Sequence, residues 1–347
     1  MKEKLLFTAL VSLFTVVTFS SCSKNENNNR SIDVYVAGGE DNPSDNPDDN
    51  SRGLRAAKVW KNGQLLYTLN DSVNDASANA VFVSGSDVYV AGYEGYTGAM
   101  VWKNGQPLYT FTNSTAHSIY VSGNDVYTAG RENYILKVWK NDRQLYALTD
   151  GTKDAFAESV FVSGSDVYVA GREDNASYKR VAKVWKNGQP LYALNDSTNE
   201  ATAISVFVSG NDVYAAGAEG NTSDNDVAKV WKNGQLLYTL TDGTSQAFAM
   251  SVFVSENDIY VAGYEVNASN KRVAKVWKNG QLLYALTDGT NRAVAESVFV
   301  SGSDVYTAGY ERNASDKDVA KVWKNAQQLY VLTDGITHAG AYSIFVK

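Results

Sequence analysis

The sequence predicts an all-β fold, and three features support that prediction. Helix-type periodicity of apolar residues is absent, whereas Tyr and Trp are abundant and Gly recurs at regular places in the 347-residue chain. One stretch of sequence repeats along most of the chain, and each repeat contains one Trp. Within a repeat, short apolar runs alternate with turn dipeptides such as Asn-Gly, which favour tight β-hairpins. The repeat decides the fold, because repeats of this length define a whole architecture.

Each repeat is expected to contain four short strands, as the stretch from Ser297 to Leu332 illustrates. Strand A covers 297–300, and a Gly-Ser turn leads to strand B at 304–308. A longer loop leads to strand C at 321–323, which carries the Trp, and a second tight turn leads to strand D at 328–332. Seven Trp mark seven repeats, and each of the last four follows its predecessor by 46 residues: Trp60, Trp102, Trp139, Trp185, Trp231, Trp277 and Trp323.

Four antiparallel strands repeated at this spacing are typical of the blades of a β-propeller. Neighbouring positions such as Val305 and Tyr306 point to opposite faces of a strand, yet both are apolar. Each sheet must therefore be covered on both faces, as it is between two other blades. We predict a seven-bladed β-propeller of four-stranded blades over residues 32–347.

The order of the strands predicts how the ring closes. The first repeat begins at strand B, at Asp33, and the chain ends in a strand A without a following B, at Tyr342 to Val346. We expect the C-terminal strand to complete the N-terminal blade, because this pairing removes an exposed sheet edge.

The hairpin of strands A and B resembles the kelch repeat, in which a hydrophobic stretch ends in a small residue and Gly. The single Trp per repeat strengthens the likeness, which covers the whole predicted propeller. This chain has Ala-Gly, as at Ala262-Gly263, where kelch repeats have Gly-Gly. The resemblance implies a propeller architecture. Kelch-like propellers occur both as protein-binding modules and in enzymes, so the likeness does not choose between these functions.

The first 31 residues differ from the repeats and indicate export. Lys2 and Lys4 precede an apolar run of about 15 residues, whereas crossing a bilayer as a helix takes roughly 20. The run ends at Phe19-Ser20-Ser21-Cys22, which resembles a bacterial lipobox with Phe where Leu is usual. An ordinary secretory signal with an incidental Cys is the alternative. We predict a lipoprotein signal peptide over 1–21, lipidation of Cys22 with chains such as palmitate, and a flexible polar tether over 22–31.

Composition narrows the location and the partners. The Asn-rich tether resembles the signal that sends some Gram-negative lipoproteins to the cell surface. We therefore expect an outer-membrane lipoprotein of the cell envelope, held to the membrane only by its lipid and monomeric. The formal net charge of −7 argues against nucleic acid as a partner, because duplex binding needs clustered cations. Cys22 is the only Cys, so the mature chain contains no disulfide.

Some polar positions are constant among the repeats and are interpreted as structural. A Glu lies two residues after the Gly of every strand B, and a Lys precedes Val-Trp in every repeat except the second, which has Met100. We expect cross-strand Glu–Lys ion pairs, and a ring of carboxylates that binds cations is the alternative. The Asp that opens each strand B is interpreted as a turn residue that accepts hydrogen bonds from local backbone amides.

Two other positions vary strongly, and the predicted topology places both on the face that carries the D-to-A and B-to-C loops. The residue before the Ser of strand A, or before Ala80 in the second repeat, is Asn79, His117, Glu158, Ile204, Met250, Glu296 or Tyr342. The residue after the Gly of strand B is Gly39, Tyr93, Arg131, Arg172, Ala218, Tyr264 or Tyr310.

From these two sets we select the candidates for contact with a glycan or protein ligand at the mouth of the central channel, because they offer stacking surfaces and hydrogen bonds. Drift at solvated positions is the alternative. The candidates are Tyr93, Arg131, Arg172, Tyr264, Tyr310, His117, Glu158, Glu296 and Tyr342.

No catalytic or cofactor motif is evident. The chain has two His, His117 and His338, and it lacks a nucleophile elbow, a phosphate loop and a zinc signature. Glu158 and Glu296 are three repeats apart, which is unsuited to a glycosidase carboxylate pair. The sequence thus predicts a non-catalytic module that binds a glycan or a protein and needs no cofactor or metal. A glycan-active enzyme and a purely structural envelope scaffold are the alternatives.

Overall fold

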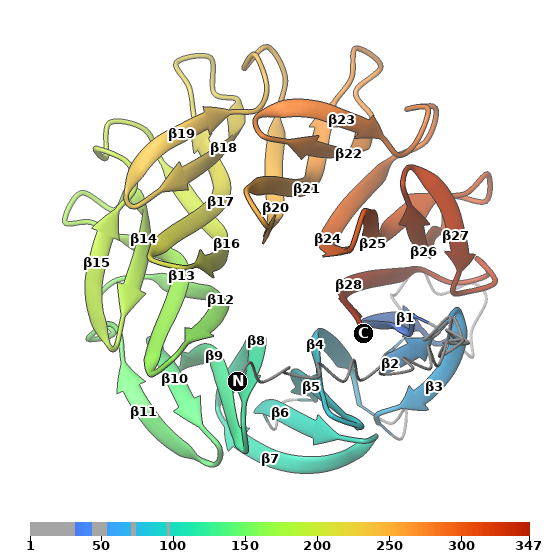
Figure 1. Cartoon of the computed structure of the whole chain (residues 1–347), viewed down its shortest axis with the longest axis horizontal. Helices are drawn as coiled ribbons and strands as arrows, with labels where there is room; N and C mark the ends of the chain where they lie inside the picture. Colours follow the sequence, from blue (N-terminus) through green and yellow to red (C-terminus); the bar gives the residue numbers. More distant parts are fainter. Residues whose placement is uncertain (1–31, 44–53, 71–73, 96–97) are drawn as a thin grey trace, which may run out of the picture. The chain divides into compact units, whose positions relative to one another are not determined.

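The computed structural model describes residues 32–43, 54–70, 74–95 and 98–347. The predicted signal peptide, the lipidation site at Cys22 and the tether lie outside the described residues. Residues 32–347 form one compact unit. In that unit, seven antiparallel sheets of four strands surround a common axis, as Figure 1 shows. The prediction of a seven-bladed β-propeller is confirmed.

The strands of each blade run in sequence order from the axis outward, except in blade 1. Blade 1 contains β28 (Ala339–Val346), β1 (Val34–Asp41), β2 (Arg55–Lys61) and β3 (Gln64–Thr68). Blade 2 contains β4 (Ala76–Ser84), β5 (Asp87–Glu94), β6 (Gly98–Lys103) and β7 (Gln106–Thr112). Blade 3 contains β8 (Ser114–Ser122), β9 (Asp125–Glu132), β10 (Ile135–Lys140) and β11 (Arg143–Ala147). Blade 4 contains β12 (Ala155–Ser163), β13 (Asp166–Asp174), β14 (Arg180–Lys186) and β15 (Gln189–Ala193).

The last three blades repeat the same plan. Blade 5 contains β16 (Ala201–Ser209), β17 (Asp212–Gly220), β18 (Asp226–Lys232) and β19 (Gln235–Thr239). Blade 6 contains β20 (Ala247–Ser255), β21 (Asp258–Val266), β22 (Arg272–Lys278) and β23 (Gln281–Ala285). Blade 7 contains β24 (Ala293–Ser301), β25 (Asp304–Arg312), β26 (Asp318–Lys324) and β27 (Gln327–Val331). The inner strands are longer than expected from the sequence, because a β-bulge interrupts their alternation of side chains where the predicted strand A begins.

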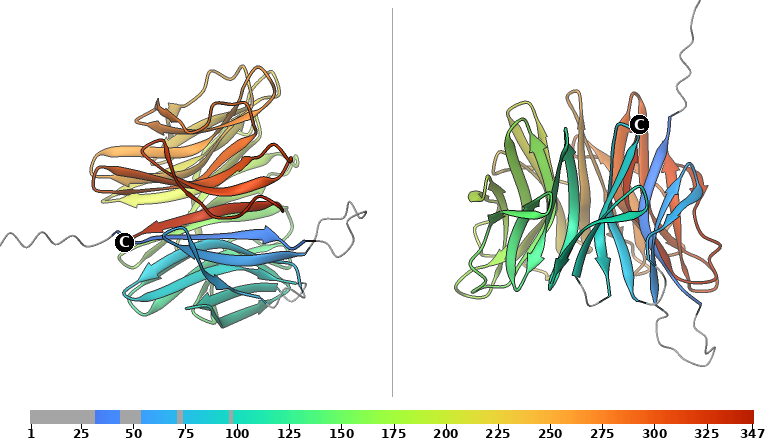
Figure 2. Two further views of the ribbon diagram at one scale, coloured as in Figure 1. Left: turned by 90° about the vertical axis from the view of Figure 1, so that its right-hand side faces the viewer. Right: turned by 90° about the horizontal axis from the view of Figure 1, so that it is seen from below.

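The ring closes through the two ends of the chain, as predicted. The C-terminal strand β28 pairs antiparallel with β1, with Val36 opposite Ile344. Both backbone hydrogen bonds between Asp33 and Lys347 extend this pairing, at 2.8 and 2.9 Å. The dark red strand beside the blue one in Figure 2 is this junction.

The hydrophobic core lies between the blades. Each Trp is buried against the preceding blade, as Trp102 is against Ala57 and Val59 of blade 1. The inner strands are also joined by side chains, because a Ser Oγ of one inner strand accepts a hydrogen bond from a backbone N–H of the next. Six such bonds of 3.0 to 3.2 Å join the described inner strands. At the seventh junction the Ser is replaced by Ala80, and Asn79 Nδ2 instead donates to the carbonyl oxygen of Ala116 at 2.8 Å.

The expected Glu–Lys ion pairs are confirmed. In blade 4, Lys183 Nζ lies 2.6 Å from Glu173 Oε2 across β13 and β14. The same pair forms in every other blade that has both residues, namely Lys58–Glu40, Lys137–Glu132, Lys229–Glu219, Lys275–Glu265 and Lys321–Glu311.

The interpretation of the Asp that opens strand B is wrong in one respect. In blade 4, Asp166 Oδ2 lies 2.7 Å from Lys186 Nζ, and Asp166 Oδ1 accepts a hydrogen bond from Asn187 Nδ2 at 2.7 Å. Asn187 in turn accepts the N–H of Val167. The Asp side chain therefore bonds the hairpin between strands C and D to the start of strand B, and not the backbone amides of the turn that precedes it. These bonds lower the pKa of Asp166 and raise that of Lys186.

Candidate functional site

The variable residue of each strand A is the extra residue of a β-bulge. In blade 4 the pairing of β12 with β13 passes from Ala157 directly to Ser159, which leaves Glu158 without a partner opposite. The inner strands of the other blades show the same shift. Because a bulge re-aims its side chain, this residue can contact the adjacent inner strand. His117 and Glu158 meet in this way, with 3.8 Å between Nδ1 and Oε2.

The bulge also explains the constant Gly of strand B. A Cβ atom added to Gly171 would lie 2.0 Å from the carbonyl oxygen of Phe156 on the bulged strand. The equivalent distance in the other blades is between 1.8 and 2.0 Å. Ala-Gly therefore marks the close approach of two backbones. The two variable residues of each blade occupy equivalent backbone positions on strands A and B.

A ring of aromatic side chains narrows the central channel, three residues along each inner strand from the bulge. The rings contact in a closed circle, with centroids 4.7 to 5.1 Å apart. Seven centroids at this spacing lie on a circle of about 11 Å diameter. The members are Phe82, Tyr120, Phe161, Phe207, Phe253, Phe299 and Phe345.

A pocket with a volume of about 490 Å³ opens on the face that carries the loops between strands B and C. It lies over blades 2 and 3 and reaches blade 4. Three of the residues selected from the sequence, Tyr93, His117 and Arg131, line it together. The other lining residues are Gly95, Gly98, Asn113, Ser114, Thr115, Asn133, Tyr134 and Phe156.

Arg131 is held in a fixed position in the wall of this pocket. Its Nη1 atom lies 3.1 Å from Asp154 Oδ1. Its guanidinium also lies 4.5 Å from the ring centroid of Tyr134 and 4.7 Å from that of Phe156. Arg172 covers Phe156 as well, at 4.6 Å. Such stacking leaves guanidinium N–H groups available in a defined plane.

Two more polar side chains of the pocket, His117 and Tyr93, are positioned by neighbours. His117 Nε2 lies 3.0 Å from Thr115 Oγ1, and Tyr93 donates a hydrogen bond of 3.0 Å to Asp75 Oδ2. Tyr134, in the turn between β9 and β10, is 65% exposed. The pocket thus combines an exposed aromatic ring with an oriented cation and an imidazole.

The other selected residues do not line this pocket. Arg172 and Glu158 contact residues that line it, and a second group lies in blades 6 and 7. Tyr264 and Tyr310 are buried in blades 6 and 7 around Val294, and Tyr264 stacks on Phe248 at 5.6 Å. The two Tyr are therefore packed residues and not solvated ones. Glu296 is the bulge residue beside them on β24.

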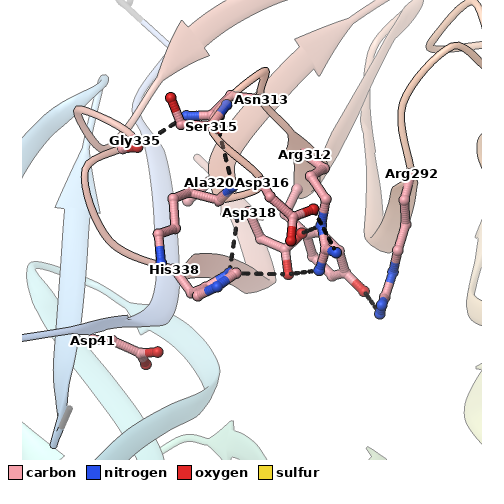
Figure 3. A network of polar contacts seen from close by, with 12 residues as sticks. Asp41, Arg292, Arg312, Asn313, Ser315, Asp316, Asp318, Ala320, Gly335 and His338 are labelled. Carbon is pink, nitrogen blue, oxygen red and sulfur yellow. Dashed lines mark hydrogen bonds and ion pairs between the residues drawn. The ribbon is translucent and has the colours of Figure 1, made fainter. Parts of the chain in front are cut away.

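Tyr342, the bulge residue of β28, belongs to neither group and is tied to blade 1. Its hydroxyl oxygen accepts a hydrogen bond of 2.5 Å from Arg55 Nη1. Arg55 in turn lies 3.0 Å from Asp41. Figure 3 shows the neighbouring polar network of blade 7, in which Asp318 contacts both Arg312 and His338.

Sequence reasoning missed several residues of these groups. Phe156 and Thr115 lie two residues before a bulge residue, directly opposite the variable residue of strand B. This position also varies among the repeats, so the same comparison could have identified it. Tyr134 lies in a loop whose length differs between repeats, and no alignment of repeats could have identified it.

Within residues 32–43, 54–70, 74–95 and 98–347, no three His, Cys, Asp or Glu side chains are grouped so that they could hold a metal ion. In the same residues there is no apolar helix long enough to span a bilayer.

The comparisons with known proteins concern the fold alone. No protein-family model and no curated protein matches the sequence. Among solved structures, the chain is similar to a puromycin-hydrolyzing peptidase of Mycobacterium tuberculosis, with a TM-score of 0.50 and 12% identity over 83% of this chain. The match covers 50% of the peptidase, so the chain spans half the length of that protein. The β-propeller domain of Cps50 (Swd1) from Myceliophteria thermophila has a TM-score of 0.42 and 10% identity, over 78% of this chain and 89% of that one. The class of protein is a seven-bladed β-propeller.

Proposed function

We propose that the protein is a non-catalytic binding module that takes a short glycan in the pocket over blades 2 to 4. The observation that supports this proposal is the lining of that pocket. Tyr134 and Phe156 supply aromatic surface, while Arg131 and His117 supply hydrogen-bonding groups at its edge. A sugar presents an apolar face and a rim of hydroxyl groups, which matches aromatic rings beside fixed polar groups.

The arrangement favours binding over chemistry. Arg131 is engaged by Asp154 and two aromatic rings, which suits a rigid hydrogen-bond donor. His117 is close to Thr115 and Glu158, and neither contact creates a pair of carboxyl groups of the glycosidase type. We therefore propose that the bound sugar is released without chemical change. Release of products from a polysaccharide by the purified chain would contradict this part of the proposal.

The proposed location is the outer membrane, with the propeller carried at the cell surface on lipidated Cys22. The support is the Phe19-Ser20-Ser21-Cys22 segment and the polar residues that follow it. Growth with an alkyne analogue of palmitate should label the chain, and Cys22→Ser should abolish the label. Protease treatment of intact cells should remove the propeller if it faces outward.

The test of ligand binding uses two exposed Tyr in equivalent loops. Tyr134 lines the pocket, whereas Tyr178 does not, is 75% exposed, and has its ring 4.3 Å from Lys153 Nζ. Both have positive φ, of 69° and 58°. The full chain is screened on a glycan array, and the affinity for the best glycan is then measured by calorimetry.

We expect Tyr134→Ala to weaken binding about tenfold, or about 1.4 kcal/mol, through loss of ring contact. Tyr178→Ala should bind as the wild type does. Equal affinity of all three proteins, or capture of peptides and no glycan, would refute the proposed role of the pocket.

A further inference from the structure

One contact recurs between adjacent blades on the same face as the pocket. The first residue of a strand C lies near the residue that precedes the next inner strand, 20 positions later. Between blades 4 and 5 these residues are Arg180 and Glu200, which form an ion pair of 2.5 Å. Between blades 7 and 1 they are Asp318 and His338, 3.6 Å apart. At both of these junctions the contact joins a basic side chain to an acidic one.

Between blades 6 and 7, both residues are cations. Arg272 begins β22, and Arg292 precedes β24. Two cations at these equivalent positions cannot form the complementary contact seen at the other junctions, and their like charges repel unless an anion lies with them. Neither Arg forms an ion pair within the described residues.

The two Arg are held in place by Tyr and not by carboxylates. The guanidinium of Arg272 lies 4.6 Å from the ring centroid of Tyr264. Arg292 Nη2 donates a hydrogen bond of 3.0 Å to the hydroxyl oxygen of Tyr310 (Figure 3, where Arg292 is labelled). Arg292 Nε is buried and has no hydrogen-bond partner in the part of the chain that the structure describes. A buried N–H of this kind costs free energy until an acceptor reaches it.

The carboxyl group that interacts electrostatically with both Arg is that of Glu296, the bulge residue of β24. Its charge interacts with Arg272 and Arg292, but it makes no hydrogen bond to either. Although the side chain keeps some exposure, the dense surroundings remove water from the carboxyl group and raise its pKa to about 7. The groups that interact with it are Arg272 on β22, Arg292 before β24 and Tyr264 on β21, and Tyr310 on β25 packs in one cluster with Tyr264.

We propose that Arg272, Arg292 and Glu296 form a site for an oxyanion, the carboxylate or sulfate group of an acidic sugar. A carboxylate at Glu296 competes with the ligand for the same two guanidinium groups, so its ionisation should release the ligand. Arg binds such groups through paired N–H donors in one plane. The Tyr that hold the guanidinium groups keep those donors oriented before the ligand arrives. The site is on blades 6 and 7, so this inference stands apart from the pocket over blades 2 to 4.

The test measures binding of trigalacturonate to the full chain by calorimetry at pH 6 and pH 8. The carboxylates of this probe are ionised at both values, so a change in affinity reports on the protein. Maltotriose is the neutral control, and inorganic sulfate is the competitor. Because the neutral fraction of a group with a pKa near 7 falls about tenfold between these pH values, we expect binding to weaken about tenfold at pH 8.

Three variants assign the effect to the site. Glu296→Gln should bind equally at both pH values, with the affinity that the wild type has at pH 6. Arg272→Gln and Arg292→Gln should each weaken binding at least tenfold at pH 6. The matched control is Arg180→Gln, which removes an Arg from the equivalent contact between blades 4 and 5 and should leave affinity unchanged.

Competition by sulfate would indicate that any oxyanion is accepted, and its failure would indicate a preference for carboxylate. The proposal is overturned if trigalacturonate binds no better than maltotriose, if the two Arg variants bind as well as Arg180→Gln, or if Glu296→Gln keeps the dependence on pH. If a Gln variant loses its cooperative melting, Arg292→Lys replaces it, which keeps the charge and removes the planar donors. That variant should still weaken binding.

Discussion

Deletion of residues 343–347 should unfold the propeller, because these residues close the ring. The deletion removes Ile344 and Val346, which are buried against blade 7, and Phe345, which belongs to the aromatic circle. Full burial of one such side chain stabilises a fold by about 1.5 to 3 kcal/mol, so Ile344 and Val346 together contribute about 3 to 6 kcal/mol, and the partly buried Phe345 adds to this. This is a large part of the stability of about 5 to 15 kcal/mol expected for a native protein.

The assay is limited proteolysis of the truncated and full chains, together with thermal melting followed by tryptophan fluorescence. We expect the truncated chain to be insoluble or rapidly cleaved, because deletion also exposes the edge of β1. A truncated chain that melts at the temperature of the full chain would refute the closure.

Two single substitutions distinguish the effect of ring closure from the effect of removing a core side chain. Ile344→Ala and Ile119→Ala remove the same side chain, each 5% exposed, from the same place on β28 and on β8. Each should lower the free energy of unfolding by about 2 to 5 kcal/mol in urea titrations. If the C-terminal strand were detached in solution, Ile344→Ala alone would have no effect.

Three further changes test how the repeats are held together. Ala326→Gly should raise the free energy of unfolding by about 1 kcal/mol, because Ala326 has a φ of 69°, at which Gly is unstrained. An unchanged urea midpoint would count against this reasoning. Ala80→Ser should also stabilise the fold by about 1 kcal/mol by restoring the missing hydroxyl acceptor between inner strands, while Ser205→Ala should destabilise it by about as much. A urea midpoint that falls for Ala80→Ser, or one that does not fall for Ser205→Ala, would contradict the role of this contact. The bonds of Asp166 to Lys186 and Asn187 hold its pKa below the ordinary 3.8, so the stability that Asp166 adds is present above about pH 4 and is lost as the pH falls further. Asp166→Asn should therefore make the urea midpoint fall less steeply below pH 4 than it does in the wild type. An equally steep fall in both proteins would exclude this contribution.

The number of blades, the closure and the Glu–Lys pairs could be predicted from the sequence because each follows from local spacing repeated seven times. Lys183 and Glu173 occupy neighbouring strands joined by one hairpin, so alternation of side chains is enough to bring them together. The pairing of β28 with β1 follows from counting strands, because one unpaired segment remains at each end of the series.

The role of the strand B Asp required the tertiary structure. Asp166 meets Lys186 and Asn187 because the hairpin of strands C and D folds back along strand B, and the sequence alone does not show where that hairpin ends in space. The bulge that orients Glu158 was likewise hidden, since an extra residue in a strand leaves no composition signal of its own.

The sequence by itself determined the repeating frame of this protein, and only the tertiary structure decided which variable side chains act together. Variation among repeats selected Tyr93, His117 and Arg131, but it could not show that these three share a pocket while the charge of Glu296 interacts with two Arg elsewhere. The physical reason is that blade interiors are set by contacts repeated within each unit. The surface sites instead combine residues from different blades, and their distances depend on the curvature of the whole ring.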